Sequence, residues 1–285
     1  MTSNHENTGP ANLDRAVVDD FGAEWQRFDQ SGVTEPEMAR MFGEYFAVFP
    51  WERLTPDAVG FDAGCGSGRW AALMAPRVGH LHCVDAAGAA LAVAKQRLGH
   101  MPNVSFYEAS VDAMPLADGS MDFGYSLGVL HHMPDTAAGL AACVRKLKPG
   151  APMQVYLYYA FDNRPAWFRL VWQISDVIRQ VVSRMPFRLK SLLAEIFAAT
   201  VYWPLTRSAR LCEKVFGTDV GNWPLSAYRW RSYYSMRTDA LDKFGTRLEQ
   251  RFTAAQITAM MEAAGLTDIR FSQAVPFWCA VGIKK

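Results

Sequence analysis

Cysteines are few in this chain and lie far apart. The 285 residues include five of them, at positions 65, 83, 143, 212 and 279, and none forms a CxxC pair. This scattering argues against a structural zinc site and against a disulfide framework, and the sequence predicts no bound metal. A reducing cytoplasm is therefore the expected compartment.

Long hydrophobic runs are also missing. No stretch of about 18 or more apolar residues occurs, so we expect no membrane-spanning helix. The segment from Met1 to Pro10 is polar and lacks the apolar core of a secretory signal. Neither sign of charge dominates, since 29 basic residues face 28 acidic ones, and no global field draws the chain to nucleic acid.

The rest of the composition is that of an ordinary globular protein. Half of the residues are hydrophobic and a fifth are charged. The length suits one large domain, or one domain with a sizeable insertion.

From residue 58 onward, short apolar runs alternate with helical patterns. Such alternation is typical of an α/β protein with an open, mostly parallel sheet. We expect helices around residues 69–78, 86–98, 136–147 and 253–264. Strands are predicted at 58–61, 80–84, 104–107, 121–127, 153–159, 269–272 and 277–283.

The sequence around this core predicts two helical regions. Residues 1–55, with helices at 17–28 and 35–49, are expected to form an N-terminal lid. Residues 160–245 interrupt the alternation and predict a helical insertion, which we expect to act as a cap that holds an acceptor. Apolar residues recur there at steps of three and four, predicting amphipathic helices over 167–185 and 189–197. The core would then comprise 56–159 and 246–285.

The sharpest motif is a glycine-rich turn between the first strand and the following helix. It has the spacing Asp-x-Gly-x-Gly-x-Gly, from Asp62 to Gly68. Glycines allow positive φ and close approach to a ligand. The dinucleotide pattern GxGxxG fails because Arg69 stands at the third glycine position, which disfavours an oxidoreductase. An acidic residue before the turn suits a ligand that presents an ammonium group.

Three further stretches follow strands at the edge of the sheet where ligands bind. Asp85 ends the second strand, where it could accept both hydroxyls of a ribose or cap the next helix. Asp112 follows the third strand, where it could bind an exocyclic amine or remain solvated. His131 and His132 follow the fourth strand.

These four stretches, in this order, resemble the class I methyltransferases that depend on S-adenosylmethionine (SAM), in particular the branch with ubiquinone- and natural-product-type enzymes. The resemblance covers residues 56–159 and, more loosely, 248–285. It implies a Rossmann-like fold with a seven-stranded, mostly parallel sheet whose last strand is antiparallel. The implied SAM-binding residues are Asp62, Gly64, Cys65, Gly66, Gly68, Asp85, Ala86, Asp112, Ala113, Ser126 and Leu127.

The resemblance also implies the reaction. SAM would give its methyl group to a small-molecule acceptor by in-line displacement, and a hydroxyl acceptor would also need a base. His132 is the first candidate for that base and His131 the second, although His131 could equally be a packing residue. The candidate acceptor-binding residues are Trp25, His132, Tyr158, Tyr159 and Asp162.

The insertion has an excess of basic residues. Residues 164–214 include nine basic and three acidic side chains, interleaved with aromatic residues. Three interpretations remain open: a lid that packs its apolar stripes on the core, a peripheral membrane surface, and a site for an anionic acceptor.

Two rival functions use the same cofactor. A nucleic-acid methyltransferase predicts a basic groove and an added binding module, and neither is evident. A non-catalytic SAM-binding protein would lose the acceptor site, whereas His132 and the insertion are present. The sequence therefore predicts a small-molecule methyltransferase without a nucleic-acid partner.

Overall fold

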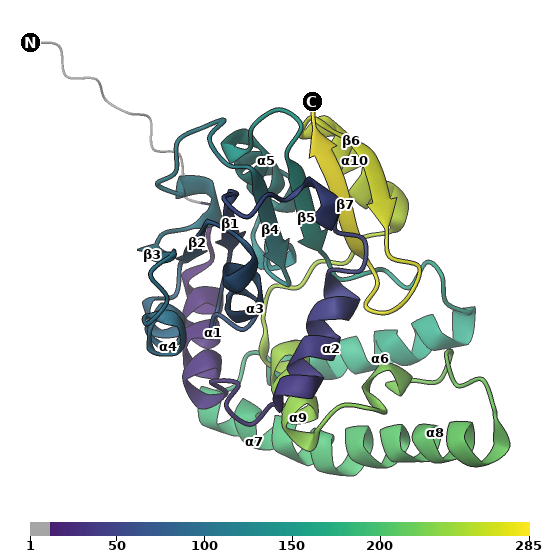
Figure 1. Ribbon diagram of the computed structural model, residues 1–285. Helices are drawn as coiled ribbons and strands as arrows, with labels where there is room; N and C mark the ends of the chain where they lie inside the picture. The colour runs from purple at the N-terminus through teal and green to yellow at the C-terminus, as the bar shows by residue number, and fades with distance from the viewer. Residues whose placement is uncertain (1–11) are drawn as a thin grey trace, which may run out of the picture.

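A seven-stranded sheet organises the computed structural model, which describes residues 12–285 (Figure 1). The segment interpreted above as lacking a secretory signal lies outside the described residues. The strand order is β3-β2-β1-β4-β5-β7-β6. The strands are β1 (Val59–Ala63), β2 (His80–Asp85), β3 (Val104–Glu108), β4 (Phe123–Leu127), β5 (Pro152–Tyr156), β6 (Leu266–Phe271) and β7 (Cys279–Lys284).

The pairing confirms the predicted sheet. β1 pairs in parallel with β2 and β4, and the parallel register continues outward to β3 and β5. β7 runs antiparallel to both β5 and β6. All parallel strands therefore present their carboxyl ends at one edge of the sheet, which is where the loops that carry the predicted motifs meet.

Helices cover both faces of the sheet. In chain order, the core helices are α3 (Ala71–Met74), α4 (Gly88–Leu98), α5 (Thr136–Lys146) and α10 (Ala254–Ala263). α3 is shorter than the predicted helix over 69–78, because a 3₁₀ turn with Pro76 follows it and proline lacks the N–H that would continue the α-helix.

Two hydrophobic clusters lie on opposite faces of the sheet because side chains alternate along each strand. One contains Met153 and Val155 of β5, with α5 and α10. The other contains Phe123 and Tyr125 of β4, with α4 and α2 (Glu35–Tyr45). α1 (Arg15–Arg27) starts at Asp14, whose carboxylate accepts hydrogen bonds from two helix N–H groups, so the helix begins before the predicted position.

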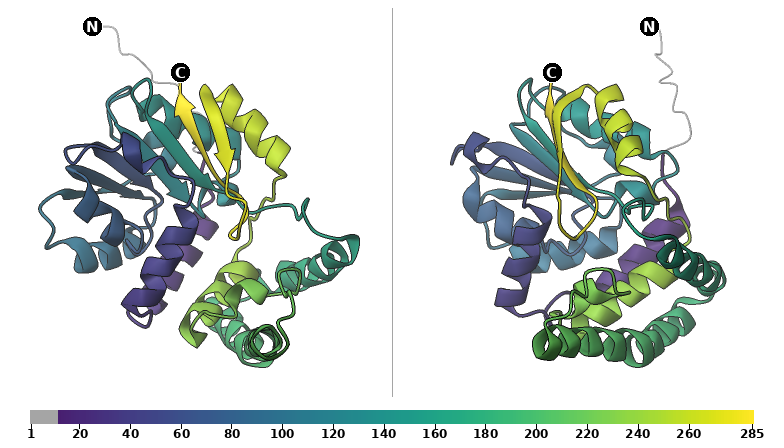
Figure 2. Two further views of the ribbon diagram at one scale, coloured as in Figure 1. Left: turned by 45° about the vertical axis from the view of Figure 1, so that its right-hand side comes forward. Right: turned by 90° about the vertical axis from the view of Figure 1, so that its right-hand side faces the viewer.

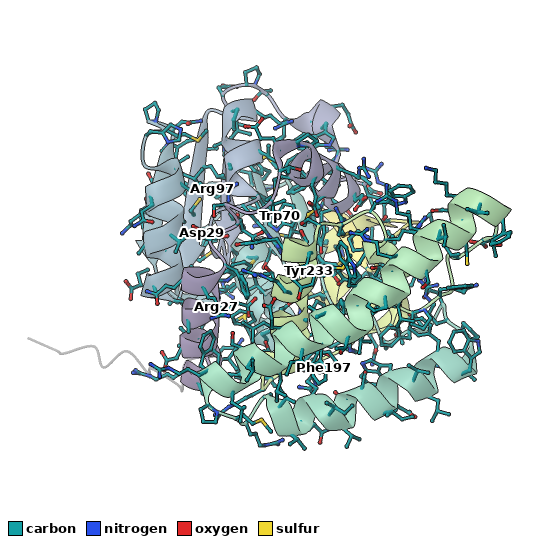
Figure 3. The ribbon with its side chains drawn as sticks, turned by 90° about the horizontal axis from the view of Figure 1, so that it is seen from below. Arg27, Asp29, Trp70, Arg97, Phe197 and Tyr233 are labelled. Carbon is teal, nitrogen blue, oxygen red and sulfur yellow. The ribbon has the colours of Figure 1, made fainter. Side chains whose placement is uncertain are left out.

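The insertion lies below the carboxyl edge of the sheet (Figures 1 and 2). It contains α6 (Ala166–Val182), α7 (Phe187–Phe197), α8 (Trp203–Phe216) and α9 (Tyr233–Gly245). A π-helical segment, Ala198–Tyr202, joins α7 to α8 without a break, so that one long helix passes Phe197 (Figure 3). None of the described helices is long and apolar enough to cross a membrane.

Residues 237–245 belong to α9 and do not form a loop, because Met236, Ala240 and Leu241 supply a buried helix face. The apolar stripe of α6 does not pack on the core: Leu170, Ile174 and most of its other apolar side chains are exposed. The interpretation of α6 as a lid that packs its apolar stripe on the core is therefore wrong.

Candidate active site

The predicted motifs meet at a cavity at the carboxyl edge of the sheet, here called the inner cavity. It lies between the loops after β1, β2 and β4 on one side and helices α1 and α9 on the other. Of the predicted residues, it is lined by Trp25, Gly64, Cys65, Gly66, Asp85, Ala86, Leu127, His132 and Tyr158.

The glycine loop lines the inner cavity, and Gly64 and Gly66 leave little room for a side chain. Gly64 has φ +81°, and a Cβ there would lie 2.3 Å from Cγ2 of Val129. Gly66 has φ +54°, and a Cβ there would lie 3.0 Å from Nε1 of Trp25. The loop therefore presents bare backbone to a ligand, as a close cofactor contact requires.

Asp85 holds the loop to the end of β2. Its carboxylate accepts hydrogen bonds from the N–H groups of Gly66 and Ala87, both at 2.8 Å. Burial raises the pKa of Asp85. The alternative role as a helix cap does not apply, because Ala87 is the N-cap residue of α4 and no side chain caps that helix. Asp85 lines the inner cavity, where a ribose hydroxyl could reach it.

Asp62 lies beneath the loop and does not line the cavity. It is 1% exposed, and burial raises its pKa from the ordinary 3.8 to about 8. One carboxylate oxygen has no hydrogen-bond partner. The expected direct contact between Asp62 and a ligand ammonium group is therefore not available in this conformation.

Four other predicted cofactor residues also stand back from the cavity. Gly68 packs against α4, and the Ser126 hydroxyl donates to the Ala63 carbonyl. Asp112 accepts hydrogen bonds from Ser110 and from the N–H of Asn12, while Ala113 is exposed. Ser110 and Val111 line the cavity in their place, and they could have been predicted only from the path of the loop.

His132 faces the inner cavity in a defined tautomer. Its Nδ1 lies 2.7 Å from the carbonyl oxygen of Leu248, which can only accept, so Nδ1 carries the proton. In the neutral ring Nε2 is then the acceptor nitrogen, and it has no hydrogen-bond partner. It lies 3.9 Å from Oδ1 of Asp242. This is the geometry of a general base with a carboxylate beside it.

His131 has a different environment from its neighbour. It is fully buried and stacks on Tyr158 with ring centroids 3.9 Å apart, and it lines neither cavity. Burial lowers its pKa well below the ordinary value. The structure thus disfavours His131 as a catalytic base and supports the alternative of a packing residue.

The sequence did not single out three carboxyl groups of the inner cavity: Glu24, Asp239 and Asp242. Glu24 is 3% exposed, and burial raises its pKa well above the ordinary value. Burial also raises the pKa of Asp242, which accepts a hydrogen bond from the Tyr158 hydroxyl. The many polar residues of 237–246 could have pointed to Asp239 and Asp242. The sequence has no comparable signal for Glu24 apart from its place on a predicted lid helix.

A second cavity, here called the outer cavity, lies between the core and the insertion. The two cavities share Tyr45, Arg69, Tyr156, Tyr158, Tyr228, Asp239 and Lys243 in their walls. Tyr159 lines the outer cavity, as expected for an acceptor residue. Asp162 does not, because its carboxylate accepts hydrogen bonds from the N–H of Ala254 and Nε1 of Trp278. Within residues 12–285, no three His, Cys, Asp or Glu side chains are placed to hold a metal.

Residues 61–153 match a family model described as a methyltransferase domain. This segment runs from β1 into β5 and includes the glycine loop, Asp85 and both histidines.

Two similar proteins have quinone-related names. A ubiquinone biosynthesis O-methyltransferase of Hahella chejuensis is 34% identical over 170 residues, 59% of this chain and 66% of that protein. A 2-phytyl-1,4-naphtoquinone methyltransferase of Thermosynechococcus vestitus is 34% identical over 133 residues, 44% of this chain and 59% of that protein. The chain spans less than two thirds of the length of these relatives.

Solved structures share the fold at low sequence identity. A chain from the complex of the Haloferax volcanii Trm112 methyltransferase activator superposes with a TM-score of 0.53 and 15% identity, covering 94% of this chain and 96% of its own. A protein of Bordetella parapertussis gives a TM-score of 0.53 and 15% identity, covering 92% and 79%. The matched segment places residues 61–153 in a methyltransferase-domain family, and the strand order and glycine loop agree with the class I, S-adenosylmethionine-dependent fold.

Proposed function

We propose that this protein transfers a methyl group from SAM to a hydroxyl group of an aromatic small molecule. SAM occupies the inner cavity, and the acceptor occupies the outer cavity with its hydroxyl group extending past the shared wall to His132. The observation that carries this proposal is His132 in the wall of the inner cavity, with a buried Nε2 that has no hydrogen-bond partner. A non-catalytic SAM-binding protein has no use for such a group.

The inner cavity fits SAM in shape and in charge. Gly64 and Gly66 form a cradle that a Cβ would fill, and Asp85 offers a carboxylate for ribose hydroxyls. Five carboxyl groups line the cavity against two basic side chains, Arg69 and Lys243, which favours a cationic ligand. Bound SAM supplies an electrophilic methyl carbon on its sulfonium.

The residues of this chain then position the acceptor and take up the proton of its hydroxyl group. His132 accepts the hydroxyl proton at Nε2, while the Leu248 carbonyl keeps the ring in the required tautomer. The Asp242 carboxylate, 3.9 Å away, stabilises the imidazolium that results. Holding donor and acceptor in line supplies a further share of the rate, about 7 kcal/mol or more in favourable cases.

An aromatic acceptor is supported by the walls of the outer cavity. Tyr156, Tyr158, Tyr159, Phe161 and Trp172 line it, and flat rings pack well against such walls. The two quinone-related relatives point to the same substrate class. A nucleic-acid acceptor is disfavoured because the charged groups of this cavity are largely paired, as in Arg231 with Glu44.

Calorimetry with S-adenosylhomocysteine tests the cofactor assignment. We expect binding by the intact protein, a loss of at least about tenfold in Asp85→Ala, and no change in Asp57→Ala, an exposed aspartate away from both cavities. Methyl transfer from labelled SAM to a panel of hydroxylated benzenes and quinones then tests the reaction. Cofactor binding without transfer to any of them would contradict the proposed acceptor class.

A further inference from the structure

The insertion exposes an unusually apolar surface. On α6, Leu170, Ile174, Val177 and Val181 are 58%, 59%, 63% and 58% exposed, and they recur at the spacing of one helix face. On α8, Leu211 and Phe216 are 59% and 74% exposed. We call the outward surface of α6 and α8 the apolar face. So many large apolar side chains exposed on two helices indicate an interaction site.

The exposed charged side chains on helices α6, α7 and α8 are all basic. Within residues 163–218, all of which the structure describes, the basic residues classed as exposed are Arg169, Arg184, Arg188, Arg210 and Lys214. The acids of that range, Asp176, Glu195 and Glu213, are partly buried, and the nearest exposed acids along the chain, Asp162 and Asp219, lie just outside it. All three partly buried acids pair with arginines: Asp176 with Arg179, Glu195 with Arg237 and Glu213 with Arg229. The surface is therefore apolar with a positive border.

The outer cavity reaches this surface. Val171 of α6, Val201 of the π-helical segment and Leu205 of α8 all line it, yet they are 48%, 41% and 41% exposed. Residues 183–186 join α6 to α7 at one end, and the two long helices diverge toward the other (Figure 3). An apolar molecule at the surface could therefore enter the outer cavity between the helices without crossing water.

We propose that the apolar face docks on a bilayer containing anionic lipids, and that the acceptor is a lipophilic molecule taken up from that bilayer through the outer cavity. The uptake part rests on the proposed function. Apolar helix faces with basic borders bind such interfaces by burying side chains near the headgroups while arginines and lysines meet anionic phosphates. A second copy of the chain is a poorer partner, because a two-fold interface would bring the same positive borders together.

Cosedimentation of the full chain with vesicles tests the docking. We expect binding to phosphatidylcholine vesicles that contain phosphatidylglycerol, weaker binding to pure phosphatidylcholine, and a decrease as salt rises. The variant Ile174→Ser/Val177→Ser/Val181→Ser removes apolar side chains that line neither cavity. It should bind vesicles at least about tenfold more weakly.

Two charge-reversal variants distinguish the effect of the basic border from the effect of the protein's net charge. Arg184→Glu/Arg188→Glu should weaken binding to anionic vesicles by about tenfold or more, whereas Lys95→Glu/Arg145→Glu, which changes the same charge at exposed sites on α4 and α5, should not. Calorimetry with S-adenosylhomocysteine checks that every variant keeps a folded cofactor site.

The outcomes distinguish this inference from the proposed function. A protein that binds S-adenosylhomocysteine but stays in the supernatant with every vesicle would overturn the docking and leave the methyltransferase assignment intact. A dimer in light scattering that the α6 variant dissociates would assign the face to a second copy and overturn the docking as well. Vesicle binding without cofactor binding would instead keep the docking and refute the proposed function.

Discussion

At the scale of single residues, the hydrogen bond from His132 to Leu248 decides which nitrogen can act as a base. His132→Asn should lower kcat by about 10² to 10⁴ fold, since general-base catalysis contributes that much. Affinity for S-adenosylhomocysteine should stay unchanged, because Asn can still donate to the carbonyl. His131→Asn, away from the cavity, should act through stability alone. Single-turnover rates and calorimetry on both variants measure the difference, and equal losses of rate would contradict the assignment.

Gly64 tests how closely the backbone must approach the cofactor. Gly64→Ala combines a positive φ with a Cβ 2.3 Å from Val129 and should abolish S-adenosylhomocysteine binding. Gly150→Ala is the matched control, since Gly150 has nearly the same φ, +82°, with open space around its Cβ. The control should lose only about 1–2 kcal/mol of stability and keep its cofactor affinity.

The buried carboxyl of Asp62 makes stability depend on pH. Its folded pKa of about 8 lies above the ordinary 3.8, so the folded state binds the extra proton. The contribution of Asp62 to stability is therefore fully present below about pH 4 and is lost as pH rises toward 8, by up to about 1.4 kcal/mol per pH unit. Asp62→Asn should flatten this decline, so that the variant is the more stable protein at pH 8 in urea unfolding. Parallel pH curves for the two proteins would rule this out.

At the scale of helices, one buried lysine joins three of them. Lys190 of α7 is 2% exposed, lies 2.6 Å from Asp20 of α1 and donates to the Gly245 carbonyl at the end of α9. Lys190→Ala should cost about 2 kcal/mol of unfolding free energy, because it leaves these acceptors without their charged donor. The exposed Lys214→Ala of α8 should cost less than about 0.5 kcal/mol. Urea titrations of both variants give the comparison.

The amphipathic pattern of α6 shows what the sequence could not predict about this helix. Periodicity identifies an apolar stripe, but it does not say what covers it. In the structure α6 contacts α9, and its residues Ser175, Asp176 and Arg179 line the outer cavity. The stripe is thereby left on the outside.

At the scale of the whole molecule, the insertion completes the outer cavity. Replacing residues 165–210 with a short linker should abolish methyl transfer and leave S-adenosylhomocysteine binding measurable. Because that change also exposes α9, Trp172→Ala offers a milder test. It removes an aromatic wall of the outer cavity and should raise KM for the acceptor with little effect on cofactor affinity. Unchanged acceptor kinetics in Trp172→Ala would place the acceptor elsewhere.

The sequence by itself determined the strands of the sheet, its antiparallel last strand through the family resemblance, and the glycine loop with Asp85. These features are encoded locally, because strand, turn and helix signals follow one another within about 30 residues. The ends of helices were predicted less well where a proline or a buried polar residue lies in the segment, as at Pro76 and in α9.

Only the tertiary structure decided which of two adjacent histidines faces the cavity. His132 owes its tautomer to Leu248, 116 residues further along, and its carboxylate neighbour to α9. His131, next to it, packs against Tyr158. The outward direction of the apolar stripe on α6 was decided in the same way. Contacts between segments so distant in the chain depend on how the helices pack on the sheet, and no local pattern specifies them.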